Sequence, residues 1–270
     1  MLKIIVFVKQ VVDISQLKFD ADGVGTLENA TGGEINPFDL NALELAVQIK
    51  DKLGASVTTV SMGEAGAEAI LKDTIARGAT DTLLLEDAAF KGSDTIATAY
   101  ILASAVKKLG EFDLIICGEK TVDGDTGQIG AEIAEYLNIP HIGYVSSLED
   151  IGEKLVVVSD MDSDQHTIEC GFPVLLTVTK NINTPRLPSL RDKLNSRKAK
   201  VEVWHADNLS SVADKNLFGE QGSVIKVEKI LLPSEGGRKG KDLQGSPEEI
   251  VKELVDDLER DGLLRGIGAK

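Results

Sequence analysis

The stretch from residue 117 to residue 130 carries the most informative chemistry, because it follows an apolar run and opens a helical pattern. At the carboxyl end of a buried strand, the free N–H groups of the next helix and its dipole attract an anion. Glycines let the backbone approach a phosphate closely, and a hydroxyl or an amide adds further hydrogen bonds. The predicted phosphate-binding residues are Gly118, Asp123, Gly124, Asp125, Thr126, Gly127, Gln128, Ile129 and Gly130.

The same stretch allows two other interpretations. It lacks the Gly-Lys-Ser/Thr ending of a Walker loop and the usual glycine spacing of dinucleotide-binding loops. In the simplest alternative, Asp123 and Asp125 shape a turn and cap the helix, and the glycines only interrupt the chain. A magnesium site at the two aspartates is less favoured, since a hard cation needs more oxygen ligands than two neighbouring carboxylates supply.

Other predicted strand ends carry small or polar residues that belong to the same crevice, because ligands in open α/β sheets lie at the carboxyl ends of strands. The expected contributors are Phe7, Val8 and Lys9 after the first strand, Met62 and Gly63 after the second, and Asp94, Thr95 and Thr98 at the start of a later helix. Each of these sites can also be an ordinary helix start. Asn36 precedes Pro37 at a helix entrance, where its amide and the Phe38 ring can face an adenine or a ribose.

The elements that hold these residues alternate between strand and helix. Nearly continuous apolar runs predict strands buried on both faces at residues 2–8, 56–62, 82–85, 114–117 and 174–178. Amphipathic patterns predict helices at 40–53, which Asp39 can cap, and at 65–77, 94–110 and 127–137. This order predicts a doubly wound, mostly parallel sheet of the Rossmann-like, adenine-nucleotide-binding kind, with an antiparallel addition at 155–177.

The chain is expected to form two parts. Residues 1–230 make the nucleotide-binding α/β domain, and residues 231–270 make a linker, rich in Pro and Gly as far as residue 246, and a C-terminal helix. Ser246, Pro247 and Glu249 give that helix a strong start. A lone amphipathic helix cannot bury its own apolar face, so we expect it to dock on another polypeptide.

Composition narrows the classes of function. The 270 residues carry 29 Lys and Arg against 44 Asp and Glu, a net charge of −15, which argues against binding to nucleic acid or to an anionic membrane surface. We expect no signal peptide and no membrane insertion. Cys117 and Cys170 lie in apolar runs, which favours a reducing cytoplasm over a disulfide or zinc framework. The scattered histidines predict no catalytic residues and no metal site.

The sequence resembles the β subunit of electron-transfer flavoproteins over nearly its whole length. The resemblance rests on four segments: Val6 to Val11, Asn36 to Asp39, Asp123 to Gly130, and the basic run Arg197 to Lys200. It implies a heterodimer with an FAD-bearing α subunit. In simple members the β subunit holds AMP at the phosphate loop, whereas in electron-bifurcating members a second FAD places its AMP half there. The stretch from Gly92 to Thr98 resembles the bifurcating kind, so FAD is expected and AMP is the alternative.

The resemblance also implies redox partners. The loop from Pro185 to Arg191 resembles a partner-recognition loop in which Leu190 is the anchor and Arg191 a basic neighbour; the alternative is a buried Leu190 that holds the loop down. The implied partners are the α subunit, a dehydrogenase of the acyl-CoA or hydroxy-acid type, NADH and ferredoxin. Two rival functions stay open: a carrier with AMP and no bifurcation, and a module that senses adenine nucleotides without transferring electrons.

Overall fold

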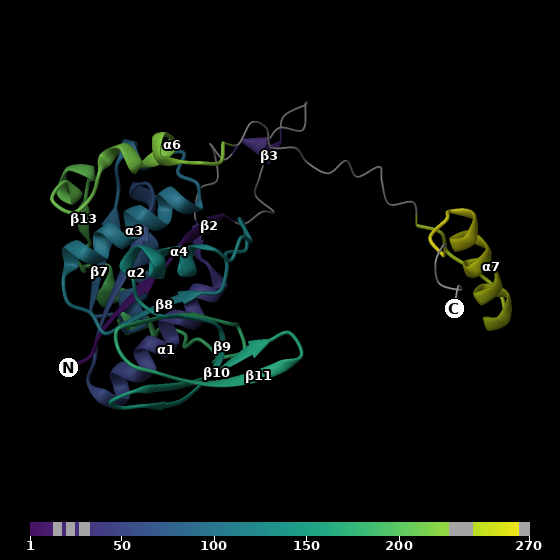
Figure 1. Cartoon of the computed structure of the whole chain (residues 1–270), viewed down its shortest axis with the longest axis horizontal. Coiled ribbons are helices and arrows are strands. Elements are labelled where there is room, and N and C mark those ends of the chain that lie inside the picture. The colour runs from purple at the N-terminus through teal and green to yellow at the C-terminus, as the bar shows by residue number, and fades with distance from the viewer. Residues whose placement is uncertain (13–17, 20–24, 27–32, 227–239, 265–270) are drawn as a thin grey trace. The chain divides into compact units, whose positions relative to one another are not determined.

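The computed structural model describes residues 1–12, 18–19, 25–26, 33–226 and 240–264, and these contain a nine-stranded sheet (Figure 1). The strand order in this sheet is β11-β10-β9-β12-β8-β1-β6-β7-β13. Its strands are β1 (Lys3–Phe7), β6 (Ser56–Met62), β7 (Asp81–Leu85), β8 (Leu114–Gly118), β9 (His141–Ile151), β10 (Leu155–Met161), β11 (Asp164–Cys170), β12 (Val174–Val178) and β13 (Glu202–Trp204). Two small antiparallel pairs join β2 (Gln10–Val12) to β5 (Gly33–Ile35) and β3 (Lys18–Phe19) to β4 (Gly25–Thr26).

The central strands confirm the predicted fold class. Strands β12, β8, β1, β6, β7 and β13 are all parallel to their neighbours. The antiparallel addition begins before the predicted residue 155, because β9 already belongs to it. This strand is parallel to β12 on one side and antiparallel to β10 on the other. β12 itself, which the predicted addition overlapped, belongs to the parallel part of the sheet.

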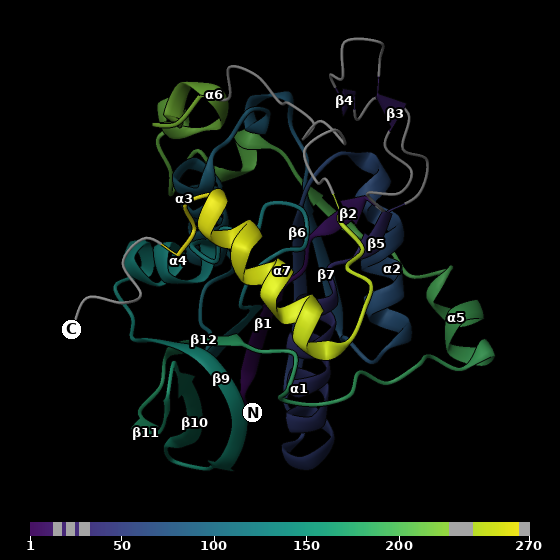
Figure 2. The ribbon, with the colours of Figure 1, turned by 90° about the vertical axis from the view of Figure 1, so that its right-hand side faces the viewer.

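Helices cover both faces of the sheet, as Figure 2 shows with α1 and α2 on one side and α3 and α4 on the other. The helices of this unit are α1 (Pro37–Leu53), α2 (Glu68–Ala76), α3 (Thr95–Leu109), α4 (Ile129–Leu137), α5 (Leu190–Ser196) and α6 (Gly219–Gly222). Successive β1 side chains point to opposite faces, so Ile4 packs in the core with α1 and α2 while Ile5 packs in the core with α3 and α4. Burial on both sides explains why this strand is apolar from Ile4 to Phe7.

Helix boundaries follow local backbone chemistry. The predicted cap at Asp39 is wrong: α1 begins at Pro37, with Asn36 in the N-cap position, and Asp39 lies inside the first turn. Proline has its φ fixed at a helical value and needs no hydrogen-bond partner at this position, so it starts the helix earlier than the apolar stripe suggested. The helix predicted at 65–77 begins as a short 3₁₀ turn, and the one predicted from 127 begins two residues later.

The structure divides into two compact units, Met1–Ile230 and Leu231–Lys270. In the second unit, helix α7 (Pro247–Arg260) begins with a capping box: the Ser246 side chain accepts the N–H of Glu249, and the Glu249 side chain accepts the N–H of Ser246. The helix start predicted at Ser246 is thereby confirmed. Most of the predicted linker, residues 231–239, lies outside the described residues. None of the described helices combines the length and apolar character that crossing a membrane requires.

Candidate functional site

The carboxyl ends of β1 and β8 mark the topological switch point of the sheet. β1 leads into α1 on one face, and β8 leads into α4 on the other, so the two connections separate above the carboxyl ends of adjacent strands. Open α/β sheets bind ligands at such a point. Here Lys9, after β1, and Asp123, after β8, form an ion pair of 2.8 Å between Nζ and Oδ2.

Asp39 is buried next to these strand ends and connects them. Its buried carboxylate accepts the Lys9 N–H at 2.8 Å and the Gly118 N–H at 3.2 Å, so it joins the ends of β1 and β8 to the first turn of α1. A Cβ on Gly118 would lie 2.6 Å from Asp39 Oδ1 and from the Cβ of Phe38, which is why only glycine fits there. Burial raises the pKa of Asp39 to about 7, despite these hydrogen bonds.

Asn36 fixes the backbone that leads into the exposed loop. Its side chain is fully buried, donates to the Lys120 carbonyl at 2.8 Å and accepts the Val122 N–H at 3.2 Å. The expectation that this amide faces an adenine or a ribose is therefore corrected: both of its polar atoms hold the 120–122 backbone in place. Phe38 is half-buried, and its ring centroid lies 5.8 Å from the Lys120 ammonium.

The predicted phosphate loop is open to solvent from Val122 to Gln128. Its backbone turns through two left-handed residues, Asp125 at φ 51° and Gly127 at φ 65°. The N-cap residue of α4, Gln128, makes no side-chain cap hydrogen bond, so the first turn of this helix presents its N–H groups without a capping side chain. The loop carboxylates have basic partners: Asp123 pairs with Lys9, and Asp125 pairs with Lys120 at 2.8 Å. The arrangement favours an anionic ligand in front of α4.

Gly130 has a packing role that the sequence did not reveal. It is buried, and a Cβ at this position would lie 2.2 Å from the Thr177 Cγ2 on β12. The absence of a side chain therefore lets α4 lie close on the sheet. This packing role does not involve the Gly130 N–H, which lies in the uncapped first turn of α4, and Gly124 and Gly127 are the glycines of the exposed loop.

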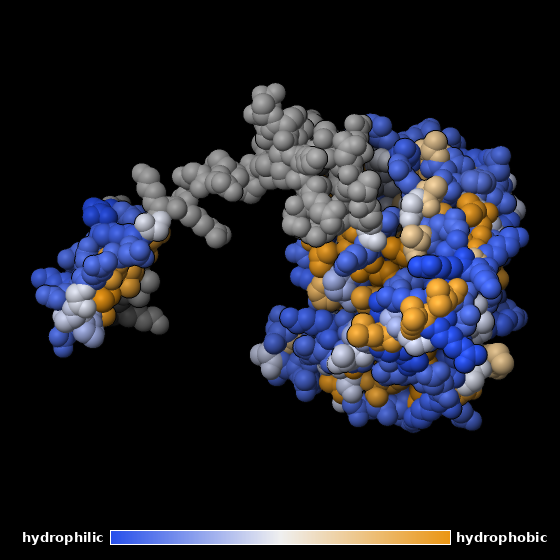
Figure 3. Space-filling model, turned by 180° about the vertical axis from the view of Figure 1, so that it is seen from behind, coloured by the Kyte–Doolittle hydropathy of each residue, from blue (hydrophilic) through white to orange (hydrophobic). Residues whose placement is uncertain are grey.

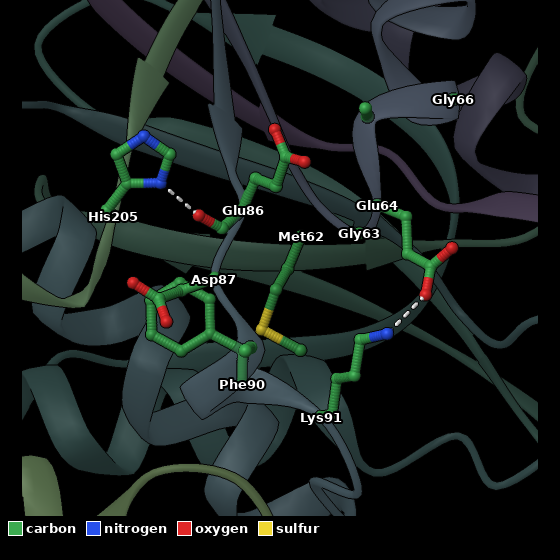
Figure 4. Close-up of a pocket in the computed structure, with 11 residues that line it drawn as sticks. Met62, Gly63, Glu64, Gly66, Glu86, Asp87, Phe90, Lys91 and His205 are labelled. Atoms are coloured by element: carbon green, nitrogen blue, oxygen red, sulfur yellow. Dashed lines mark hydrogen bonds and ion pairs between the residues drawn. The ribbon is translucent and has the colours of Figure 1, made fainter.

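A cavity of about 670 Å³ lies along the same carboxyl edge, at the ends of β6 and β7 (Figure 4). It is lined by the predicted stretch after the second strand, Met62 to Gly66, and also by residues that the sequence reasoning missed: Glu86, Asp87, Ala88, Phe90, Lys91 and His205. Glu64 and Lys91 form an ion pair of 2.9 Å at this cavity, and the His205 ring contacts the Glu86 carbonyl. Glu86 and Asp87 directly follow the strand predicted at 82–85, and this position is the signal that could have identified them. His205 had none, because only β13 brings it here.

The start of α3 is tied to two other segments. The Asp94 carboxylate caps the helix through the Ala97 N–H and accepts the N–H groups of Val224 and Ile225 at 2.7 and 2.9 Å. Although burial opposes it, these backbone hydrogen bonds hold the pKa of Asp94 below its usual value. The Thr95 hydroxyl donates to Glu132 on α4 at 3.0 Å, and Glu132 Oε2 is buried with no partner in the described part of the chain. Thr98 is half-buried on the same helix.

The predicted recognition loop exposes its leucines. Leu190 is 75% exposed and Leu187 is 87% exposed, which excludes the alternative of a buried Leu190. Arg191 is exposed as well. These residues lie beside α2, away from the carboxyl ends of β1 and β8, as the position of α5 in Figure 2 shows.

Comparisons with known proteins agree with one another. A family model described as "Electron transfer flavoprotein domain" matches residues 24–209. The electron transfer flavoprotein subunit beta of Thermoanaerobacterium thermosaccharolyticum is 40% identical, over 95% of this chain and 98% of its own length. The acryloyl-CoA reductase electron transfer subunit gamma of Anaerotignum propionicum is 36% identical, over 95% and 98%. The caffeyl-CoA reductase-Etf complex subunit CarD of Acetobacterium woodii is 34% identical, over 97% and 100%. The chain therefore belongs to the electron transfer flavoprotein family and, within it, to the β subunits.

Proposed function

We propose that this β subunit binds FAD, with the adenine half at the carboxyl ends of β1 and β8. The observation that carries the proposal is the start of α4, where an exposed loop and an uncapped helix N-terminus meet at the switch point of the sheet. The pyrophosphate of a dinucleotide is the anion that such a helix start accommodates. Lys9 and Lys120 neutralise the two loop carboxylates, Asp123 and Asp125, that would otherwise repel an anion beside this helix start.

The neighbouring cavity favours FAD over AMP. A mononucleotide needs only the site at the start of α4, whereas a dinucleotide needs further space, and the cavity at the ends of β6 and β7 offers about 670 Å³ along the same edge. Met62 and Phe90 give this cavity apolar surface, and Lys91 and His205 give it hydrogen-bond donors, a mixture that suits a large aromatic ring with polar edges. The two sites together match the length and chemistry of a dinucleotide better than either does alone.

Bound FAD supplies electron transfer, and this chain positions the flavin and adjusts its surroundings. We propose that electrons from NADH reach this site and are divided, in the manner of electron bifurcation, between ferredoxin and the flavin of an FAD-bearing α subunit, which then passes electrons to a dehydrogenase. Two of the similar relatives are named as parts of an acryloyl-CoA reductase and a caffeyl-CoA reductase complex, which supports a dehydrogenase of the acyl-CoA type.

The C-terminal helix supports the heterodimer. Along α7, the side chains of Val251, Leu254 and Val255 are 59%, 45% and 40% exposed. An amphipathic helix with its apolar face open to solvent is stabilised by a partner that covers it. We propose that the α subunit is that partner.

The test is the nucleotide content of the purified α/β pair. Two FAD molecules per heterodimer, and reduction of the second one by NADH, are expected. One FAD and one AMP per heterodimer, with no NADH-dependent reduction of a second flavin, would overturn the FAD assignment. A colourless chain that still binds ADP would favour a nucleotide sensor.

AMP is the second candidate ligand, and one observation favours it. The Asp94 carboxylate, expected beside the flavin, already accepts three backbone N–H groups from its own helix and from residues 224 and 225. Of the three polar residues expected to approach a flavin, Thr95 and Thr98 are left. The same nucleotide count separates this candidate from the first.

A further inference from the structure

The segment between β12 and β13 is fixed to the rest of the molecule at Arg186. The guanidinium donates from Nε and Nη2 to the two carboxylate oxygens of Glu44, at 2.8 and 3.1 Å, and from Nη1 to Asp51 at 3.0 Å. The backbone N–H of Arg186 also donates to Glu44, at 3.0 Å. The Glu44 side chain is only 7% exposed, and both acidic residues belong to α1. Paired, planar contacts of this kind set direction as well as distance.

The end of α2 also binds Arg186, through the Arg186 carbonyl group. Arg77, at the end of α2, donates from Nη1 to the Arg186 carbonyl at 2.7 Å, and its own Nε pairs with Asp73 at 2.7 Å. Just upstream, Asn183 exchanges hydrogen bonds with Asn41 of α1, at 2.9 and 3.0 Å. The segment is therefore fixed to α1 and α2 immediately before its leucines.

The buried carboxylate of this anchor is charged. Burial alone raises the pKa of Glu44, but the hydrogen bonds from the Arg186 side chain and backbone outweigh it and hold this pKa below its usual value. Glu44 is therefore ionised near neutral pH, and the anchor is an ion pair whose acidic member is buried. Removing only one member leaves a charge without its partner, so tests must change both members or keep the charge.

Three exposed leucines follow the anchor directly. Leu187 is the next residue, and Leu190 and Leu194 lie one helical turn apart on α5, at 87%, 75% and 49% exposure. Figure 3 shows how such apolar (orange) side chains stand among hydrophilic ones on the face opposite Figure 1. Exposed basic residues surround them in a chain of net charge −15: Arg191, Lys193, Arg197, Lys198 and Lys200. A protein with an apolar pocket and an acidic rim complements this surface.

We propose that Arg186 is a positioning residue that, through Glu44, Asp51 and Arg77, holds Leu187 and Leu190 ready for an acyl-CoA dehydrogenase. This inference rests on the proposed function, in which a dehydrogenase of the acyl-CoA type is a partner, and it assigns the recognition of that dehydrogenase to the exposed leucines. A segment fixed before binding loses less conformational entropy when the complex forms, so the anchor contributes to affinity without touching the partner or the flavin.

The experiment uses the full α/β heterodimer, a short-chain acyl-CoA dehydrogenase and its acyl-CoA substrate. Arg186→Lys keeps the charge but loses the paired geometry, and Glu44→Gln/Arg186→Met removes both charges. We expect KM for the dehydrogenase to rise about tenfold in both variants, with kcat and the rate of reducing a small dye unchanged. The matched control, Lys154→Met/Glu169→Gln, removes an exposed ion pair on the β10–β11 hairpin and leaves KM unchanged.

Hydrogen exchange tests the positioning itself. The amides of Leu187 and of residues 189–191 exchange faster in Arg186→Lys than in the unchanged protein, while those of β12 do not; equal exchange in the two proteins would overturn the inference. Leu190→Ala separates the two ideas. If it raises KM and the Arg186 variants do not, the anchor has no positioning role. If exchange rises in Arg186→Lys but Leu190→Ala leaves KM unchanged, the anchor positions the segment and the assigned docking function is wrong.

Discussion

At the scale of single residues, one buried side chain beside the proposed nucleotide site makes the stability of the protein depend on pH. This residue is Asp39, because burial raises its pKa from 3.8 to about 7. For an acid whose folded-state pKa is raised, the stability that it contributes is fully present below the unfolded value and is lost as pH rises through the folded value. Its contribution is therefore greatest in acid and smallest above neutrality.

Asp39→Asn removes this titration. Relative to the variant, we expect the unchanged protein to lose about 4 kcal/mol of unfolding free energy between about pH 4 and pH 7. Urea unfolding of both proteins at several pH values measures this difference. A difference that is constant across the range would show that Asp39 does not titrate there.

The close approach of Gly130 to Thr177 leads to a prediction about packing. Gly130→Ala places a methyl group against Thr177 Cγ2, at 2.2 Å before relaxation, and we expect a loss of about 1–3 kcal/mol in unfolding free energy. Thr177→Ser removes the opposing methyl group, so the double variant should recover part of the loss. The matched control is Gly124→Ala, where the nearest atom, the Thr121 hydroxyl oxygen, lies at 3.4 Å. Equal losses at the two glycines would contradict this explanation.

At the scale of elements, the start of α4 is the feature on which the proposed nucleotide binding depends. Thr126 lies in the exposed loop before this helix, where a negative charge competes with a phosphate for the same N–H groups. Thr126→Asp should weaken ADP binding at least about tenfold, equivalent to about 1.4 kcal/mol, and Thr126→Ser should leave it nearly unchanged. Isothermal titration calorimetry on the heterodimer freed of nucleotide measures both. Equal affinities for the two variants would place the phosphate elsewhere.

The elements were largely predictable because strand and helix patterns are local. Apolar runs located the central strands, and Ser246, Pro247 and Glu249 located the start of α7. The roles of Asn36, Asp94 and Gly130 were not predictable, because each depends on a partner far away in the sequence: residues 120–122, residues 224–225 and Thr177. His205 was missed for the same reason, since the last strand of the sheet carries it to the cavity.

Across the whole molecule, charge is unevenly distributed. The net charge is −15, yet the basic residues from Arg191 to Lys200 gather on and just after α5. We expect association with an acidic dehydrogenase surface to slow about tenfold between low and high salt, because screening removes the long-range attraction. Stopped-flow mixing over a range of ionic strengths measures the rate. An association rate that does not depend on salt would exclude electrostatic steering.

The leucine-bearing segment connects β12 to β13, which is the last strand of the large sheet along the chain. In the sheet, β8, β1, β6 and β7 lie between these two strands. Leu209 and Phe218, which follow β13, are buried in the core. A protease that cuts near Leu187 would thus produce two fragments that share one sheet: the second fragment contributes β13, and the first contributes the other strands. The nicked protein should give two bands on a denaturing gel and still elute from a sizing column as a single particle.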